Sequence, residues 1–289
     1  RHFVPVYLDG DSKSAQRQGA RFKIGGYPTM ILFAPDGTEI TRLPGEADAD
    51  QYMQVLALGL SGARPVKATL AAALGKGGGT AQPLSGDDWR LLAYYSWDTD
   101  EQALIPKKDL APTLRRLAQA CPPAEAATAA RLKLKALAAE SKAAGTKPAD
   151  DPAARDEIAK LLADPAIVRE SFDLVTGYPR EIVGQVSLPK TDGRAALTAA
   201  WDAVLSRLAA DPGLSAADRL SAVGARIDLA KLDAAEGKLP EPLLAGAREA
   251  AARGDRETTN PYARETVING AAYVLASAGL YTESDALLT

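Results

Sequence analysis

Cysteine and histidine, the residue types that most often carry redox, nucleophilic or metal chemistry, are nearly missing from this chain of 289 residues. There is one cysteine, Cys121, and one histidine, His2. A single cysteine excludes a dithiol centre and an internal disulfide within the chain. A single histidine at the terminus argues against a histidine-rich metal site and against a Ser-His-Asp triad. We therefore expect no catalytic residue, no metal and no cofactor in these residues.

Cys121 itself can be interpreted as a lone nucleophile or as a packed thiol. It precedes Pro122 and Pro123 near the end of an expected helix. The C-terminal end of a helix is the wrong pole to stabilise a thiolate, and no histidine follows to activate the sulfur. We favour a packed, inert thiol.

Two short acidic clusters are the remaining candidates for metal binding. One consists of Asp9 and Asp11, the other of Asp98, Asp100 and Glu101. Neither has the glycine at position 6 and the glutamate at position 12 that a calcium loop requires. We interpret both as helix caps and solvated turns.

The glycine-rich run at 76–80 has the order Lys-Gly-Gly-Gly-Thr. A phosphate loop needs Gly-Lys-Ser/Thr at its end, so we interpret this run as a flexible joint.

Four aromatic residues lie close together in the sequence: Trp89, Tyr94, Tyr95 and Trp97. They are compatible with a peptide-binding surface or with the buried face of a helix, and we favour the buried face. A Gly-Tyr-Pro sequence at 177–179 is followed by charged residues and not by an apolar strand. We expect it to be a loop between two helices.

The segment Gly-Gly-Tyr-Pro-Thr at 25–29 directly precedes the apolar run 30–33. A helix capped by Asp11 or Ser12 is expected before it, and a β-rich run at 3–8 precedes that helix. After it, Asp36-Gly37 predicts a hairpin between strands at 29–34 and 38–43. Apolar residues at helical spacing follow from position 48.

This order of elements resembles the second half of a thioredoxin fold, over about residues 3–60. Tyr27-Pro28-Thr29 is similar to the X-Pro-Thr element of that family, in which the proline is cis and lies against the redox cysteines. The resemblance implies that Tyr27, Pro28 and Thr29 bind the backbone of an extended substrate, with Thr29 shaping the turn. The alternative is an ordinary turn before a strand.

The chain departs from the family in having no Cys-x-x-Cys. In the family, that motif and a central strand come earlier, and the strand lies between those corresponding to 3–8 and 29–34. We therefore expect 3–8 and 29–34 not to pair directly. The chain opens at Arg1 without methionine and stops at Thr289 soon after an expected helix begins. We interpret it as a fragment truncated at both ends, with the redox cysteines upstream of Arg1.

From Ser85 the chain is rich in alanine and leucine and has helical spacing, beginning with a capping-box pattern from Ser85 to Asp88. Residues 272–284 resemble the junction of two helices in a tetratricopeptide repeat. The sequence thus predicts a partial α/β thioredoxin-like domain at 1–60, a linker with a short helix at 61–83, and an all-α helical array at 84–289 that is truncated at its C-terminus. Further helices are expected at 109–120, 123–143, 153–163, 194–209, 215–235, 241–253 and 262–278.

The resemblance implies a bacterial thiol–disulfide oxidoreductase that acts on a protein substrate or redox partner, with the helical domain binding a partner. This chain alone would be inactive. The alternative is a non-catalytic thioredoxin-like binding or scaffold protein. A net charge of −3 without a basic stripe argues against nucleic acid binding. No apolar run is long enough for a transmembrane helix. Thioredoxin-like proteins with such appendages are often exported, which favours the periplasm.

Overall fold

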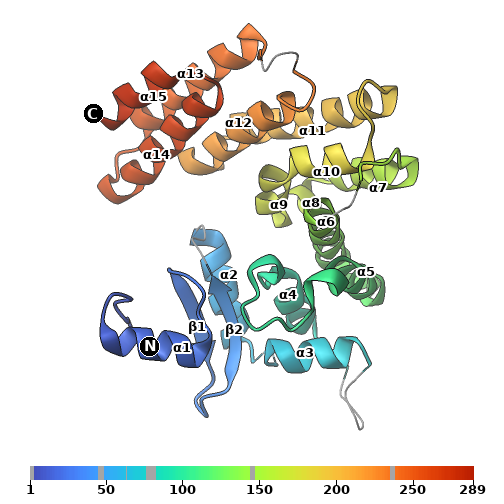
Figure 1. The fold of residues 1–289 in the computed structure, drawn as a ribbon, viewed down its shortest axis with the longest axis vertical. Helices are drawn as coiled ribbons and strands as arrows, with labels where there is room; N and C mark the ends of the chain where they lie inside the picture. The colour runs from blue at the N-terminus through green and yellow to red at the C-terminus, as the bar shows by residue number, and fades with distance from the viewer. Residues whose placement is uncertain (1–2, 45–48, 63, 76–82, 144–146, 235–237) are drawn as a thin grey trace. The chain divides into compact units, whose positions relative to one another are not determined.

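A computed structural model describes residues 3–44, 49–62, 64–75, 83–143, 147–234 and 238–289 (Figure 1). Most of these residues are helical, and the strands among them form one two-stranded antiparallel sheet. The chain divides into two compact units, residues 1–139 and 140–289. The glycine-rich run expected as a joint lies outside the described residues. The described residues from 84 onward are all helices and connections, which is consistent with the predicted helical array.

Unit 1 begins with a helix, a hairpin and two further helices, and continues with helices that the sequence analysis assigned to a second domain. Its elements are α1 (Lys13–Phe22), β1 (Thr29–Phe33), β2 (Glu39–Pro44), α2 (Ala49–Leu60), α3 (Val66–Ala73), α4 (Gly86–Tyr94), α5 (Leu110–Ala120) and most of α6 (Ala126–Lys142), within which the unit ends, with 3-10 turns at Trp97–Thr99, Lys107–Asp109 and Pro123–Glu125.

The ends of α1 are set by local chemistry. The Ser12 side chain caps the helix by accepting the backbone N–H of Ala15 at 3.2 Å. Lys23 ends the helix in the left-handed conformation, with φ of 54°. Small residues, Ala15 and Gly19, form its buried face. Of the two predicted caps, Asp11 and Ser12, the structure uses Ser12.

The hairpin forms as the Asp-Gly turn predicts. Thr29 faces Pro44 and Phe33 faces Glu39, with an irregularity between Leu32 and Phe33. The Asp36 carboxylate accepts the backbone N–H of Thr38 at 2.8 Å, and this hydrogen bond lowers the pKa of Asp36. Gly37 has φ of 84°, a conformation that glycine adopts without steric cost. The turn therefore sets the register through contacts between residues a few positions apart.

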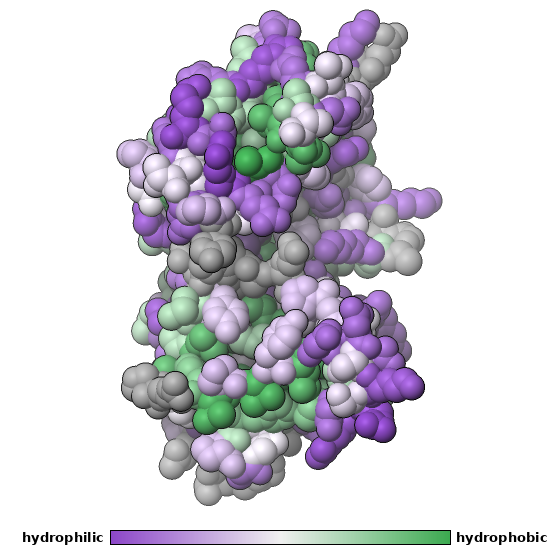
Figure 2. Space-filling model, turned by 90° about the vertical axis from the view of Figure 1, so that its left-hand side faces the viewer, coloured by the Kyte–Doolittle hydropathy of each residue, from purple (hydrophilic) through white to green (hydrophobic). Residues whose placement is uncertain are grey.

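The predicted strand at 3–8 is wrong. Residues 3–8 are in no strand, and the side chains of Val4 and Tyr7 are each 89% exposed. Within the described ranges β1 pairs only with β2, so residues 3–8 have no neighbouring strand with which to form hydrogen bonds. Pro5 also lacks the backbone N–H that strand pairing uses. Because residues 3–8 form no strand, the expectation that such a strand does not pair directly with β1 is not tested. Figure 2 shows hydrophobic residues, drawn in green, at the molecular surface between hydrophilic ones.

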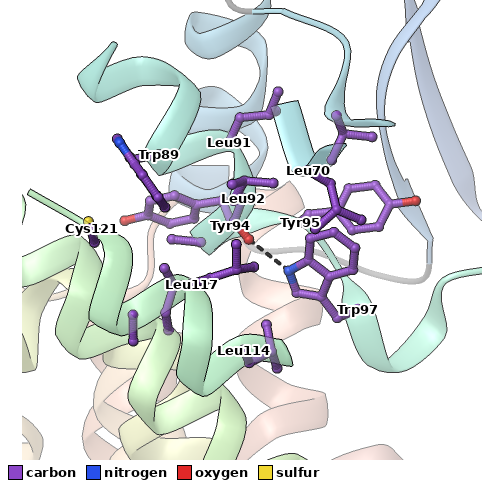
Figure 3. Packing of buried hydrophobic residues seen from close by; sticks show 14 of the residues in the cluster. Leu70, Trp89, Leu91, Leu92, Tyr94, Tyr95, Trp97, Leu114, Leu117 and Cys121 are labelled. Atoms are coloured by element: carbon purple, nitrogen blue, oxygen red, sulfur yellow. Dashed lines mark hydrogen bonds between the residues drawn. The ribbon is translucent and has the colours of Figure 1, made fainter. Parts of the chain in front are cut away.

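One hydrophobic core runs through the helices of unit 1 (Figure 3). Leu58 of α2 and Leu70 of α3 share it with Leu92 of α4, Leu117 of α5 and Leu132 of α6. The sequence analysis placed a linker at 61–83, whereas the packing continues from α2 and α3 into α4, and the division between compact units falls after Ala139. The change in composition near Ser85 therefore accompanies a change of secondary structure and not a change of core.

Unit 2 contains nothing but helices among its described residues. They are α7 (Pro152–Ala163), α8 (Pro165–Glu170), α9 (Phe172–Gly177), α10 (Pro179–Val186), α11 (Asp192–Ala210), α12 (Ala216–Ala230), α13 (Glu241–Glu257), α14 (Pro261–Ser277) and α15 (Tyr281–Leu288). Pro152, Pro165, Pro179 and Pro261 each occupy the first residue of a helix, where a missing N–H is tolerated.

Neighbouring helices of unit 2 pack in sequence order, α11 on α12, α13 on α14 and α14 on α15, and α12 also packs on α14. The Gly-Tyr-Pro sequence at 177–179 joins α9 to α10, as expected for a junction between helices. The tetratricopeptide-like segment forms the turn from α14 to α15, where the Ser284 hydroxyl donates to the carbonyl of Ala272 at 2.8 Å. This is a helix pair, which fits a helical repeat only loosely.

The packing of α2 on the hairpin can be tested at Gly59. A Cβ built there would lie 1.9 Å from Cδ2 of Leu32, a buried side chain of β1. We expect Gly59→Ala to destabilise this contact by about 1–3 kcal/mol through overpacking. Amide hydrogen exchange in α2 and the hairpin should accelerate, because it reports opening of this region.

The matched control is Gly246→Ala in α13, where an added Cβ meets nothing within 4 Å. It should slow exchange in α13, since alanine stabilises a helix interior by about 0.5–1 kcal/mol relative to glycine. Equal responses at the two positions would show that α2 does not pack tightly on β1.

Candidate functional site

Tyr27, Pro28 and Thr29 connect α1 to the hairpin. Thr29 is the first residue of β1, and Tyr27 and Pro28 lie in the exposed loop before it. The Tyr27–Pro28 peptide bond is cis, as the similarity to the X-Pro-Thr element implies. The side chain of Tyr27 is 59% exposed. The three residues are therefore presented at the surface, at the point where the sheet begins.

Glycines make room for the ring of Tyr27. A Cβ at Gly10 would lie 2.9 Å from two ring carbons, and a Cβ at Gly19 would lie 3.2 Å from the Tyr27 hydroxyl. The ring thus lies against the turn at Gly10 and against the small-residue face of α1. Contact on this side restrains the side chain although much of it is exposed.

The backbone of Tyr27 is left available. The ladder between the strands begins at Thr29, and among the described residues neither the N–H nor the C=O of Tyr27 has a hydrogen-bond partner. The Thr29 hydroxyl donates to the carbonyl of Gly26 at 2.8 Å and closes the turn around Tyr27 and Pro28. Thr29 therefore has the shaping role that the sequence analysis expected. The segment can offer one donor and one acceptor to an extended peptide.

A buried ionic cluster lies beside this segment, and the sequence analysis missed it. The guanidinium of Arg42 is 2% exposed and binds Glu39 at 2.7 and 2.8 Å and Glu101 at 2.8 Å. It also donates to the carbonyl of Phe22, the last residue of α1, at 3.0 Å. Gln102 donates to Glu39 at 2.6 Å.

The carboxylate partners set the electrostatics of this cluster. Hydrogen bonds from Arg42 to Glu39 raise the pKa of the guanidinium further above its ordinary value, while burial acts in the opposite direction. Arg42 therefore stays charged at every accessible pH. The only local signal was the opposite charge of Glu39 and Arg42 three residues apart, and nothing local indicates Glu101, which is 59 residues away from Arg42.

Asp100 and Glu101, two members of the acidic cluster at 98–101, have different roles. Asp100 is a turn cap, as expected, and accepts the backbone N–H groups of Gln102 and Leu104 at 3.0 and 2.7 Å. Glu101 is not solvated, because its side chain is only 13% exposed and is paired with Arg42. At the other cluster, Asp9 accepts the N–H of Asp11 at 3.1 Å. No group of three metal-ligating side chains occurs in the part of the chain that the structure describes.

The aromatic residues after Ser85 belong to the core and do not form a binding surface. Trp89, Tyr94, Tyr95 and Trp97 are all buried, and the indole N–H of Trp97 donates to the carbonyl of Leu92 at 2.7 Å (Figure 3). Burial and the hydrogen bond to Asp100 raise the pKa of Tyr95, so its hydroxyl stays protonated. The favoured interpretation of these residues is thus the one that the structure shows.

Cys121 ends α5 and packs into the same core (Figure 3). Its Sγ donates to the carbonyl of Glu125 at 3.7 Å. Burial, and secondarily the charge of Glu125, raise the pKa of the thiol to about 11. The neutral thiol is a poor nucleophile, so the structure gives Cys121 no means of reacting at neutral pH.

The reactivity of Cys121 is directly measurable. At pH 8 only about one thiol in a thousand should be ionised if the pKa is about 11. We expect the native protein to react with Ellman's reagent far more slowly than the urea-unfolded protein. Thiolate formation should increase as the pH approaches 11. Equal rates for folded and unfolded protein at pH 8 would contradict the buried position.

None of the helices in the described ranges combines the length and the apolar character needed to cross a bilayer. Comparisons with protein-family models, curated proteins and solved structures found no match for this chain. The functional argument therefore rests on the residues and contacts of the chain itself.

Proposed function

We propose that this chain is part of a thioredoxin-like thiol–disulfide oxidoreductase and that Tyr27, Pro28 and Thr29 bind the backbone of its substrate. The observation that carries the proposal is the unpaired backbone of Tyr27, an exposed residue in the loop just before β1. The order α1, loop, antiparallel hairpin, α2 supports it, because this is the order implied by the resemblance. A donor and an acceptor beside a strand suit an extended polypeptide.

The proposed chemistry needs two thiols. A thiolate attacks one sulfur of a substrate disulfide, the substrate S–S bond breaks, and a mixed disulfide forms while the second substrate sulfur leaves as a thiolate. A second enzyme thiolate then attacks the enzyme sulfur of the mixed disulfide. An enzyme disulfide forms, the mixed disulfide breaks, and the substrate departs with both sulfurs reduced while the two enzyme thiols are oxidised. Cys121 is the single cysteine of the chain and is buried with a raised pKa. We infer that the two redox cysteines come from residues preceding Arg1.

A second candidate function is a non-catalytic thioredoxin-like binding or scaffold protein. The observation in its favour is that no dithiol exists within these 289 residues. In this case the Tyr27 segment binds a partner and no exchange follows. In either case the partner is a protein, and the helices that follow the hairpin are the proposed site for recruiting it.

The first test concerns catalysis. We expect neither this chain nor Cys121→Ser to accelerate insulin reduction by dithiothreitol above background, because dithiol exchange needs two reactive thiols. A version extended by the residues that its gene encodes before Arg1 should accelerate it, and serine at the added cysteines should abolish the gain. Turnover that depends on Cys121 would overturn the first expectation. An extended protein without turnover would favour the scaffold.

The second test concerns the binding segment. Carboxymethylated insulin B chain, an extended peptide without reactive thiols, is titrated into the ¹⁵N-labelled protein. We expect shifts concentrated at the amides of Tyr27 and Thr29. Gly10→Ala should weaken binding, because the new Cβ would lie 2.9 Å from the Tyr27 ring and displace it. Gly246→Ala serves as the control and should bind normally. Shifts that leave Tyr27 and Thr29 unchanged would refute the binding role.

A further inference from the structure

A carboxylate from the helical part of unit 1 reaches the backbone just before the Tyr27 segment. The Glu101 Oε1 atom accepts the N–H of Gly25, two residues before Tyr27, and Oε2 accepts from Arg42 at 2.8 Å. A Cβ at Gly25 would lie 3.1 Å from the same Oε1, so a larger residue there would crowd the carboxylate. Gly25 and Arg42 are thus held by one side chain.

Arg42 extends this attachment to both sides of the segment. The Arg42 guanidinium donates a hydrogen bond to the carbonyl of Phe22, the last residue of α1. Arg42 also lies in β2, the strand that pairs with β1. The chain leaves α1, passes Gly25 and the Tyr27 turn, and enters β1. The end of α1, Gly25 and β1 are therefore each linked to Arg42 or Glu101, and the turn at Tyr27 and Pro28 lies between them.

Glu101 is itself held in place by the core of unit 1. Asp100 accepts the hydroxyl of Tyr95 at 2.8 Å and two backbone N–H groups of the same turn. Tyr95 is buried in the hydrophobic core that α4, α5 and α6 share with α2 and α3. The carboxylate of Glu101 is thus fixed by helices that lie outside residues 1–60.

We propose that Glu101, acting through Gly25 and Arg42, is a positioning residue that holds Tyr27, Pro28 and Thr29 in the arrangement that binds a peptide backbone. Glu101 touches no substrate. The helices after the hairpin therefore do more than recruit a partner, because they complete the binding segment. This inference rests on the proposed binding role of Tyr27, and the test separates the two.

The variants are Glu101→Ala, Glu101→Gln and the control Asp109→Asn, which removes a charge from an exposed side chain of the same unit that makes no capping hydrogen bond. Each is titrated with carboxymethylated insulin B chain and monitored by ¹⁵N NMR. Glu101→Ala should weaken binding about tenfold, the effect of losing one charge-assisted hydrogen bond. Glu101→Gln keeps an oxygen for the Gly25 N–H and should retain part of the affinity. Asp109→Asn should match the unaltered protein.

The amides of Gly25, Tyr27 and Thr29 are also compared in the free proteins. We expect them to shift in Glu101→Ala, less in Glu101→Gln, and not in Asp109→Asn, while circular dichroism melts show that each variant is folded. If the unaltered protein binds and Glu101→Ala binds equally, the positioning role is refuted and the binding role stands. If no protein binds the peptide, the binding role is refuted, and unchanged free-state amides would refute the positioning role as well.

Discussion

A buried positive charge constrains the first unit of this protein. A guanidinium removed from water costs several kcal/mol unless charged and polar partners surround it. Arg42 meets this requirement with carboxylates from Glu39 and Glu101 and the carbonyl of Phe22. These groups belong to β2, to the turn after α4 and to the end of α1. The three segments must converge for the charge to be tolerated, so the ion cluster specifies how the hairpin meets the helices.

A shared hydrophobic core also holds together the helices of the first unit. Leu58 and Leu70, from helices that precede the glycine-rich run, pack with Trp89, Leu92 and Leu117 from helices that follow it. The α/β part is too small to bury much apolar surface by itself, since a two-stranded sheet alone is marginal in water. The helices of unit 1 supply the missing burial. Within this compact unit the hairpin meets the helices through the packing of α2 on β2 and through the pairing of Arg42 with Glu101.

Local chemistry explains which features could be predicted from the sequence. Asp36-Gly37 specifies the hairpin, Ser85 and Asp88 form the capping box that their spacing predicts, and prolines mark helix starts in the second unit. These depend on hydrogen bonds between residues a few positions apart. The position of Tyr27, Pro28 and Thr29 followed from the same order of elements.

The remaining features depend on contacts distant in the sequence. The pairing of Arg42 with Glu101 requires the turn after α4 to be in place, which no short pattern encodes. The segment 3–8 has strand-type residues, yet a strand forms only when a neighbour offers hydrogen bonds, and the described residues provide none. The core that joins α2 and α3 to later helices was hidden because helical periodicity shows which face is buried and not what it is buried against.

The outer edge of β1 has a consequence for how the chain behaves in solution. Within the ranges that the structure describes, β1 pairs only with β2, and Phe33, the last residue of β1, is exposed. An unpaired strand edge flanked by apolar groups is a template for adding another chain. Association of two such edges is a bimolecular step, so its rate increases with the square of the protein concentration. Folding within one chain is unimolecular, so its rate constant does not depend on concentration. Dilution therefore protects the monomer, and crowding the molecules together favours association through this edge.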